Sequence, residues 1–257
     1  MLNYRGALVY LWNAALTSKL LYGTSFKAPS PLQLFSAPIV TGDIIGNSDL
    51  QPEKAQTVET ETSWAISPNL IASADAYYTQ VQDEVQFVHQ GANSVASNVA
   101  NSSTVGLEGT LRWQWAFLHG YLNGTLQNTN ATTPPDAVFV SQDPRSELFP
   151  TAMVNTGVSV PLPWIPVDAY LEGRYVGDQK PSESNFIQNG GVDYVVPAVF
   201  LVDVALASRD LRLFDQPLSI AAKVTNLFNT PFVYPGFAGV DIPGEGLAFN
   251  LSVSQQF

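Results

Sequence analysis

The sequence lacks cysteine altogether and holds little charge of either sign. Of its 257 residues, 11 are Lys or Arg and 22 are Asp or Glu. The absence of Cys excludes disulfide bonds, thiolate metal sites and cysteine nucleophiles. Charged residues make up 13% of the chain, whereas an average soluble domain carries roughly 25%. The hydrophobic fraction of 46% is ordinary, so uncharged polar side chains take the place of the missing charge.

Three further absences narrow the class of protein. The net charge of −11 and the pI near 4.4 leave no basic surface for nucleic acid, and we expect no nucleic-acid partner. The chain contains no run of about 18 apolar residues, so no transmembrane helix is expected. Residues 1–6 show no basic segment followed by an apolar run, and we therefore expect no signal peptide in this chain.

Apolar and polar residues alternate in segments of about ten, the pattern of β-strands with two different faces. In the segment 103–116, for example, Leu107 and Trp113 fall on one face, while Glu108 and Arg112 fall on the other. Prolines fall between such segments or at their ends, as their missing N–H requires. The pattern predicts eleven strands, at 5–11, 16–26, 54–66, 70–88, 103–116, 118–130, 150–161, 166–177, 197–208, 217–228 and 246–257.

The connections between these strands alternate between short and long. Short and long turns therefore gather at opposite ends of an up-and-down antiparallel sheet, as in outer-membrane barrels. The short connections lie near 12–15, 67–69, 116–118, 161–166 and 209–216. The long connections lie near 27–52, 89–102, 131–149, 178–196 and 229–245.

The two faces of the predicted strands differ in charge. The apolar face carries no Asp, Glu, Lys or Arg, which suits lipid, because a Lys or Arg at the bilayer midplane costs about 2–4 kcal/mol. A soluble sandwich would alternate as well, but with a solvent face richer in charge. We expect the mixed polar face to line a wet lumen. Its candidate charges are Glu108, Arg112, Asp168, Glu172, Arg174, Asp203 and Lys223, together with Lys19, Glu59, Glu61 and Asp75.

Tryptophans gather where the predicted strands meet short turns. Trp12, Trp64, Trp115 and Trp164 all adjoin such turns. Aromatic girdles at the membrane–water interfaces look like this, although aromatic residues are common in strands of every kind.

Several segments, taken in order, resemble the C-terminal barrel region of TonB-dependent outer-membrane receptors. Leu-Tyr-Gly-Thr-Ser-Phe-Lys-Ala-Pro-Ser at 21–30 is similar to the family's strand ending, with Lys27 where Arg is usual. Gly-Asn-Ser-Asp-Leu-Gln-Pro-Glu at 46–53 is similar to its re-entry into a strand, with Ser48 in place of Pro. The segments 77–83, 106–109 and 224–229 continue the resemblance, which covers essentially the whole chain.

The resemblance implies an all-β fold: an antiparallel up-and-down transmembrane β-barrel, of which this chain supplies about 11 strands of 22. Barrels of 22 strands have a plugged lumen. Residues 1–257 would form the C-terminal part of the barrel domain, without a plug domain and without the segment that contacts TonB. The implied partners are outer-membrane lipid, the missing N-terminal barrel half and plug, TonB only through that plug, and a small-molecule ligand. The implied location is the bacterial outer membrane.

The last predicted strand also resembles the signal that the outer-membrane assembly machinery reads. That signal alternates apolar residues and ends in Phe, and Phe249, Leu251, Val253 and Phe257 fit it. Gln255 departs from it, because an aromatic or apolar residue is usual there. We expect deletion of Phe257 to impair assembly into the outer membrane.

No catalytic constellation is visible, and we expect neither an enzyme nor a bound cofactor or metal. His89 and His119 lie on different segments, and the chain has no Gly-rich phosphate loop. We interpret His119 as a lumen residue and His89 as a polar residue at a loop margin. Aromatic residues in the long loops are candidate ligand contacts, or else pack the loops on themselves: Phe35, Phe186, Tyr194, Phe232, Tyr234 and Phe237.

Three functions remain open on the sequence. The first is a component of a receptor that takes up a scarce nutrient, such as an iron–siderophore complex or cobalamin, with the chain not active alone. The second is a self-contained, porin-like passive channel of ten to twelve strands. The third is a soluble all-β binding module, against which the uncharged apolar face of every strand argues.

Overall fold

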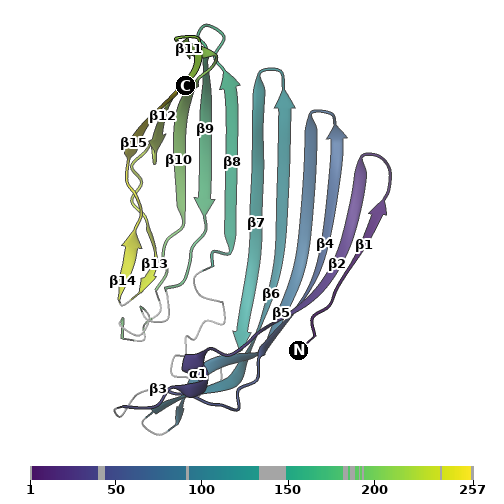
Figure 1. The fold of residues 1–257 in the computed structure, drawn as a ribbon, viewed down its shortest axis with the longest axis vertical. Coiled ribbons are helices and arrows are strands. Elements are labelled where there is room, and N and C mark those ends of the chain that lie inside the picture. Colours follow the sequence, from purple (N-terminus) through teal and green to yellow (C-terminus); the bar gives the residue numbers. More distant parts are fainter. Residues whose placement is uncertain are drawn as a thin grey trace.

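The computed structural model describes residues 2–39, 44–90, 93–132, 149–181, 185, 189–190, 192, 194–237 and 239–255. Most of these residues form one large, strongly curved and mainly antiparallel sheet, shown in Figure 1, and a short hairpin forms a separate two-stranded sheet. Its long strands are β1 (Arg5–Leu11), β2 (Leu16–Lys27), β4 (Glu53–Ser67), β5 (Leu70–Gln90), β6 (Asn93–Trp115), β7 (Leu118–Thr132), β8 (Ala152–Pro161), β9 (Val167–Val176), β10 (Val199–Ser208), β12 (Gln216–Thr225) and β15 (Ala248–Gln255). Shorter elements are α1 (Pro31–Phe35), β3 (Ile44–Ile45), β11 (Leu211–Leu213), β13 (Val233–Phe237) and β14 (Val240–Pro243).

The long strands follow one another around the sheet in chain order, as an up-and-down meander requires. Each predicted strand is present, and the predicted all-β fold is confirmed. The strand ends differ from the prediction by at most three residues, except at β6, which begins ten residues earlier than predicted. Among the described residues, β1 pairs only with β2, and β15 pairs only with β12. The sheet is therefore a partial barrel that is not closed in this chain.

The short turns lie at one end of the sheet and the long connections at the other, as predicted (Figure 1). One predicted loop, 89–102, is wrong: β5 continues to Gln90 and β6 begins at Asn93. The alternation persists there, because Ser94, Ala96 and Ala100 are buried. This alternation of buried and exposed positions is hard to see in the sequence, because the buried positions hold only small residues.

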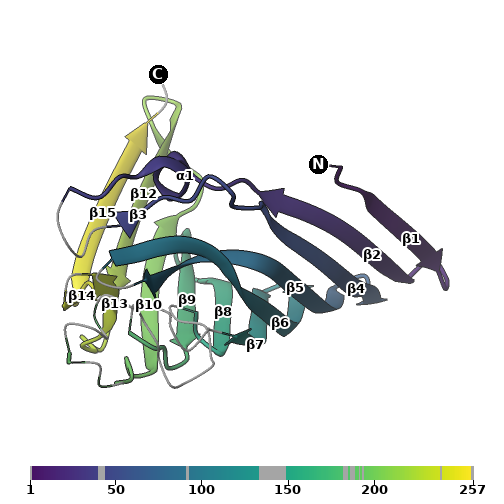
Figure 2. The ribbon, with the colours of Figure 1, turned by 90° about the horizontal axis from the view of Figure 1, so that it is seen from below.

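The two surfaces of the curved sheet differ in the way the sequence predicts. Figure 2 looks along the strands and shows the sheet as an open trough. Large apolar side chains stand exposed on the strands, including Leu107 at 51% and Leu126 at 57% exposure. The few buried apolar residues are mostly in the long connections or at the strand ends beside them, such as Leu50, Ala96 and Val196. The curved sheet itself therefore has almost no buried apolar core among the described residues.

The segment 224–229, one of those that carry the resemblance, has a structural role. Asn226 is nearly buried and adopts a positive φ of 48° at the end of β12. Its backbone N–H donates to Asp203 at 2.9 Å, and its side-chain amide donates to the carbonyls of Thr230 and Glu245. Asn229 accepts from the backbone N–H of Leu247 at 2.9 Å. These bonds fix where the chain leaves β12 and where it re-enters towards β15.

None of the described helices is long and apolar enough to cross a bilayer.

Candidate functional site: the concave wall and the loops above it

A row of acidic side chains crosses the concave face of the sheet. Strand register places Lys19, Glu61, Asp75 and Glu108 side by side on four successive strands. Lys19 Nζ lies 2.9 Å from Glu61, but no other described cation pairs with the remaining carboxylates of the row. Glu59 stands next to this row and lines the same hollow of the wall. We call Glu59, Glu61, Asp75 and Glu108 the acidic strip.

Charges on the other half of the wall are largely compensated. Lys223 Nζ lies 3.3 Å from Glu172 and 3.2 Å from Asp203, so one cation bridges two carboxylates on neighbouring strands. Asp168 pairs at 3.0 Å with Arg209, a residue in a turn that the sequence pattern did not single out. The structure thus brings together three of the predicted lumen charges and pairs a fourth with a turn residue.

Two predicted lumen arginines have no such partner. Within the described part of the chain, no hydrogen bond or ion pair reaches the guanidinium of Arg112 or of Arg174. Glu108 lies on the same strand as Arg112 without pairing with it, and Glu172 pairs with Lys223 instead of Arg174. The concave wall is therefore acidic across β4–β6, and its two unpaired cations lie towards opposite ends of the strands, Arg112 near the short turns and Arg174 near the long connections.

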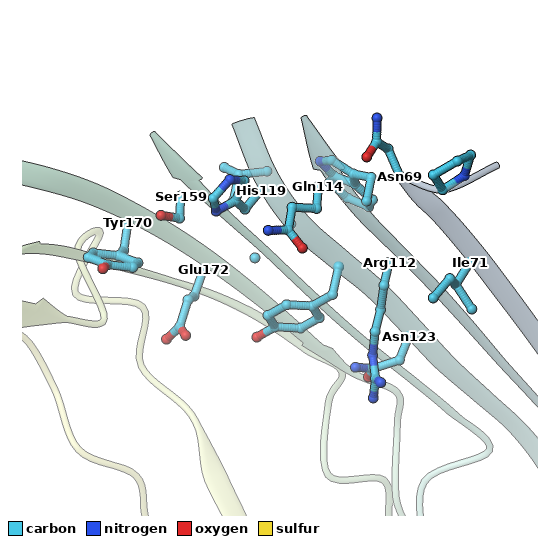
Figure 3. Close-up of a pocket in the computed structure, with 15 residues that line it drawn as sticks. Asn69, Ile71, Arg112, Gln114, His119, Asn123, Ser159, Tyr170 and Glu172 are labelled. Carbon is cyan, nitrogen blue, oxygen red and sulfur yellow. The ribbon is translucent and has the colours of Figure 1, made fainter. Parts of the chain in front are cut away.

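A hollow of about 730 Å³ opens on the concave wall close to the short turns (Figure 3). Arg112, Asn123 and Glu172 contribute side chains to it, and Figure 3 shows Arg112 beside Asn123. His119 lines the same hollow, in agreement with its interpretation as a lumen residue. Aromatic surface comes from Tyr121 and Tyr170, so the hollow combines flat rings with hydrogen-bonding groups.

Glycines let two tyrosine rings lie flat against the wall. A Cβ atom added to Gly106 would stand 2.2 Å from the ring of Tyr77, and one added to Gly157 would stand 2.6 Å from the ring of Tyr121. Tyr77 crosses over Gly106 and donates its hydroxyl to Gln127 at 3.2 Å, two strands away. The sequence shows these glycines only as polar-face positions without a side chain, and the ring contacts require the structure.

The segments at the long-connection end of the sheet form a head above the wall. β5 and β6 run beyond the neighbouring strands as an arm, which leans across the concave side in Figures 1 and 2. β3 pairs in parallel with β6, and Asn47 donates to the carbonyl of Ala96 at 3.0 Å. Asn98 and Gln51 exchange two hydrogen bonds at 2.8 and 2.9 Å. The segment 44–52 is thereby fastened along the arm.

A bulge marks the base of this arm. The register of β5 against β6 breaks on both sides of Glu84, and Asp83 adopts a positive φ of 61°. The Asp83 carboxylate pairs with Lys54 at 2.8 Å, and Glu53 accepts from the backbone N–H of Val85 at 3.2 Å. Such bulges bend strands at barrel rims. The arm therefore leaves the wall at a specified angle.

Comparison with known proteins shows which protein family has this architecture. The sequence profile of the family described as TonB dependent receptor-like, beta-barrel matches residues 1–227. The chain belongs to this family. The predicted resemblance is confirmed, as is the predicted location, because barrels of this family reside in the outer membrane of Gram-negative bacteria. No curated protein sequence matches the chain.

Solved structures share the fold of this TonB-dependent receptor-like barrel. The ferric-catecholate import receptor Fiu from E. coli K12 superimposes with a TM-score of 0.79, at 18% identity over 99% of this chain and 35% of Fiu. The siderophore receptor PirA from Acinetobacter baumannii gives 0.75, at 17% identity over 98% of this chain and 40% of PirA. The FrpB iron transporter of Neisseria meningitidis (F3-3 variant) gives 0.74, at 14% identity over 98% of this chain and 37% of FrpB. The chain thus spans about 35 to 40% of these proteins.

The last strand of this barrel presents the predicted assembly residues on one side. Phe249, Leu251 and Val253 are 67%, 63% and 63% exposed and alternate with polar residues along β15. Phe257 lies outside the described residues. Recognition of these four residues by the outer-membrane assembly machinery stays a prediction.

The candidate loop aromatics of this barrel fall into different settings. Phe35 is exposed on α1, whereas Tyr194 donates to Asp241. Phe232 and Tyr234 pack edge to face, with ring centres 5.2 Å apart. Phe186 lies outside the described residues, as does the side chain of Phe237. A role of these aromatic residues in ligand binding stays a prediction.

The described residues contain no group of three or more His, Cys, Asp or Glu side chains placed to hold a metal ion.

Proposed function

We propose that the chain is the C-terminal part of the barrel of an outer-membrane receptor that imports a scarce nutrient, such as an iron–siderophore complex or cobalamin, by a TonB-dependent mechanism. The observation that carries the proposal is the division of the sheet into an exposed apolar face without charge and a concave face with charge. Only a wall between lipid and a wet lumen needs this division. Family membership over residues 1–227 points the same way.

The class of nutrient is proposed from the structural neighbours. Fiu is described as a ferric-catecholate import receptor, PirA as a siderophore receptor and OprC as a copper transporter. A receptor or transporter role, and no enzymatic one, is what this family implies for the chain. The plug, the other barrel strands and the contact with TonB would come from residues outside 1–257.

The proposal is tested first by reading the DNA upstream of the coding sequence for an in-frame plug and eleven further strands. The gene is then deleted and the strain is grown under iron, copper or cobalamin limitation. We expect a growth defect under one of these limitations, which the intact gene reverses and a gene without the Phe257 codon reverses less well. Normal growth and normal uptake of radiolabelled iron, copper and cobalamin after deletion would contradict the proposal.

A further inference from the structure

A row of uncharged polar side chains crosses the convex, lipid-facing side of the sheet near the long-connection end. These side chains alternate along their strands with concave-face residues such as Glu61 and Asp75. Strand register places five of them side by side on β2, β4, β5, β6 and β7, and we call them the polar row: Thr24, Gln56, Gln80, Ser103 and Asn130. The polar row therefore offers carboxamide and hydroxyl groups on the outside of the barrel wall, without charge.

The carboxamides of the polar row are linked to one another and still hold free donors. Gln56 Nε2 donates to Gln80 Oε1 at 2.8 Å, and the hydroxyl of Tyr22 donates to Gln56 at 3.3 Å. Within the described residues, the amide N–H groups of Gln80 have no acceptor. Tyr22 and Tyr78 stand one row closer to the short turns and are 38% and 48% exposed. The polar row thus combines available hydrogen-bonding groups with exposed phenol rings beside them.

The polar row lies at the height where a barrel of this kind leaves the hydrocarbon. Gln80 is ten residues from Leu70, where β5 begins after a short turn. Ten residues at about 3.3 Å each, on strands tilted by about 40°, rise by about 25 Å, which is the height of the apolar band of outer-membrane barrels. The long connections of such barrels are extracellular. The polar row therefore meets the headgroups of the outer leaflet.

An apolar groove of about 500 Å³ lies on the same convex side, between the polar row and the short turns. Small residues form its floor, because register places Ala74, Gly109 and Gly124 side by side on β5, β6 and β7. A Cβ added to Gly109 would have no atom within 4 Å, so the floor is open to the bilayer. Two cross-strand pairs of leucines form the walls: Leu107 with Leu126, and Leu111 with Leu122. The groove is a recess that a flexible hydrocarbon chain can enter.

The groove and the polar row lie on the same strands, at a separation that one lipid molecule spans. Gly109 is six residues from Ser103 on β6. That is about 20 Å along the strand and, at a tilt of about 40°, about 15 Å of depth, which is half of a hydrocarbon core of about 30 Å. A headgroup on the polar row would therefore place the acyl chain of one leaflet at the level of the groove.

We propose that the convex face of β4–β7 binds a glycolipid of the outer leaflet, with sugar hydroxyls on the polar row and an acyl chain in the groove. Carboxamides both donate and accept hydrogen bonds, and therefore match sugar hydroxyls, which do the same. A phosphate would find no free cation in the row, and Lys54, two residues from Gln56, is already held by Asp83 at 2.8 Å.

The proposed lipid site is independent of the parts of a receptor that lie outside residues 1–257. It faces away from the lumen, and the edge strands β1 and β15 contribute no residue to it. A plug in the lumen or further strands at the edges would therefore leave it open. The inference goes beyond the proposed function, because it does not depend on which nutrient the receptor imports.

Fluorescence quenching by lipids with brominated chains tests the proposal, since the chain has no cysteine of its own to label. Val58→Cys places a fluorophore beside Tyr22 and Tyr78, and Phe200→Cys places one on the convex face of β10 as a reference. The full-length gene product is reconstituted into phosphatidylcholine vesicles that contain brominated glucosyldiacylglycerol, phosphatidylglycerol or phosphatidylcholine. Bromine quenches on contact, so quenching reports the affinity of each lipid for the labelled surface. We expect the glucosyl lipid to be favoured over phosphatidylcholine at least threefold at position 58 and not at position 200, and phosphatidylglycerol at neither.

Variants separate the headgroup from the acyl chain. Gln80→Leu removes free donors of the polar row, Gly109→Leu fills the groove, and each should reduce the preference at position 58 to that at position 200. Thr79→Val, on the lumen side of β5, and Ala222→Leu, on the convex face of β12, are the matched controls and should leave the preference unchanged.

Four results would overturn the proposal. The first two are equal affinities of the glucosyl lipid and phosphatidylcholine at position 58, and a preference that survives either Gln80→Leu or Gly109→Leu. An equal preference for phosphatidylglycerol would show a site without selectivity for sugar. Energy transfer between copies labelled at position 58, abolished by Gly109→Leu, would show that a second protein and not a lipid occupies the groove. None of these measurements involves uptake, so their outcome is separate from that of the proposed function.

Discussion

The phenol of Tyr194 donates to the carboxylate of Asp241, with both carboxylate oxygens 3.1 Å from the phenolic oxygen. The two residues belong to different long connections, 47 positions apart in the sequence. Asn185, only 2% exposed, donates to the same carboxylate at 2.9 Å and accepts from the backbone N–H of Gly239 at 2.7 Å. This cluster fastens the connection after β9 to the hairpin of β13 and β14.

Removal of the carboxylate should loosen that hairpin. Asp241→Ala leaves the amide of Asn185 and the hydroxyl of Tyr194 without their shared acceptor, and a lost bond to a charged group of this kind costs about 1.5–3 kcal/mol. We expect the backbone N–H of Gly239 to exchange with deuterium at least tenfold faster. Asp241→Asn keeps one acceptor oxygen, so its exchange rate at Gly239 should lie between those of the native chain and of Asp241→Ala. Unchanged exchange in Asp241→Ala would show that the hairpin is held elsewhere.

The phenol of Tyr194 should titrate at unusually high pH. Burial raises the pKa of Tyr194, and its hydrogen bond to Asp241 raises the pKa further. Because the protonated form is the one favoured in the folded state, its stabilising contribution is complete below pH 10, the usual tyrosine pKa, and is lost as the pH rises through the higher folded value. The difference in phenolate absorbance between the native chain and Tyr194→Phe measures this titration. A midpoint at or below pH 10 would contradict the prediction.

The bulge at Asp83 should tolerate residues according to their backbone preference. A positive φ costs a side chain other than Gly, Asn or Asp about 1–2 kcal/mol. Asp83→Val is therefore expected to destabilise the arm by that amount, and to speed deuterium exchange at the backbone N–H of Val85. Asp83→Asn loses only the exposed pair with Lys54, which contributes about 0–1 kcal/mol. If Asn and Val destabilised the arm equally, the ion pair and not the backbone conformation would set the bend.

Two glycines on β6 should respond in opposite ways to alanine. In Gly106→Ala the new Cβ displaces the ring of Tyr77 and breaks its hydrogen bond to Gln127, at a cost of about 1–3 kcal/mol. Gly109 has no atom within 4 Å of an added Cβ, and Gly109→Ala is expected to be neutral or to stabilise by about 0.5–1 kcal/mol. Urea unfolding in lipid vesicles measures the free energy of unfolding of both variants. A loss of stability in Gly109→Ala similar to that in Gly106→Ala would contradict the prediction.

Arginine should be costly on one face of β6 and tolerated on the other. Leu107 is half exposed on the apolar face, and Leu107→Arg is expected to lower the free energy of unfolding in a bilayer by about 2–4 kcal/mol. Thr110 lines the acidic strip, and Thr110→Arg should cost little because carboxylates are close. If the two variants were equally stable in vesicles, the assignment of the lipid-facing side would be wrong.

The wall was predictable from the sequence because its physical constraints are periodic. A strand between lipid and water must alternate, so Leu107 and Glu108 already reveal their faces. The sequence does not reveal that β6 extends through Ala96, because small side chains packed against a loop give no contrast between apolar and polar positions. The sequence pattern does not reveal the hairpin of β13 and β14 either, because its strands are only five and four residues long.

The candidate site depends on distances between side chains of different strands, and the alternation of residues along one strand does not specify these distances. Alternation placed Glu172 and Lys223 on one face, but only strand register shows that Lys223 reaches Glu172 and Asp203 together. It also shows that Arg112 has no carboxylate beside it. The partnership of Tyr194 with Asp241 connects loops whose course the sequence does not specify, so its phenol appeared only as a candidate ligand contact.

The direction of the strands has a consequence for how such a barrel can close. Eleven long strands that alternate in direction begin and end with the same orientation, and the arrows of β1 and β15 in Figure 1 point to the same end. A seam between these two strands would be parallel, whereas every pair of neighbouring long strands in the sheet is antiparallel. An antiparallel seam at both edges requires an odd number of additional strands. Eleven more would satisfy it, and would give the even total that bacterial outer-membrane barrels have.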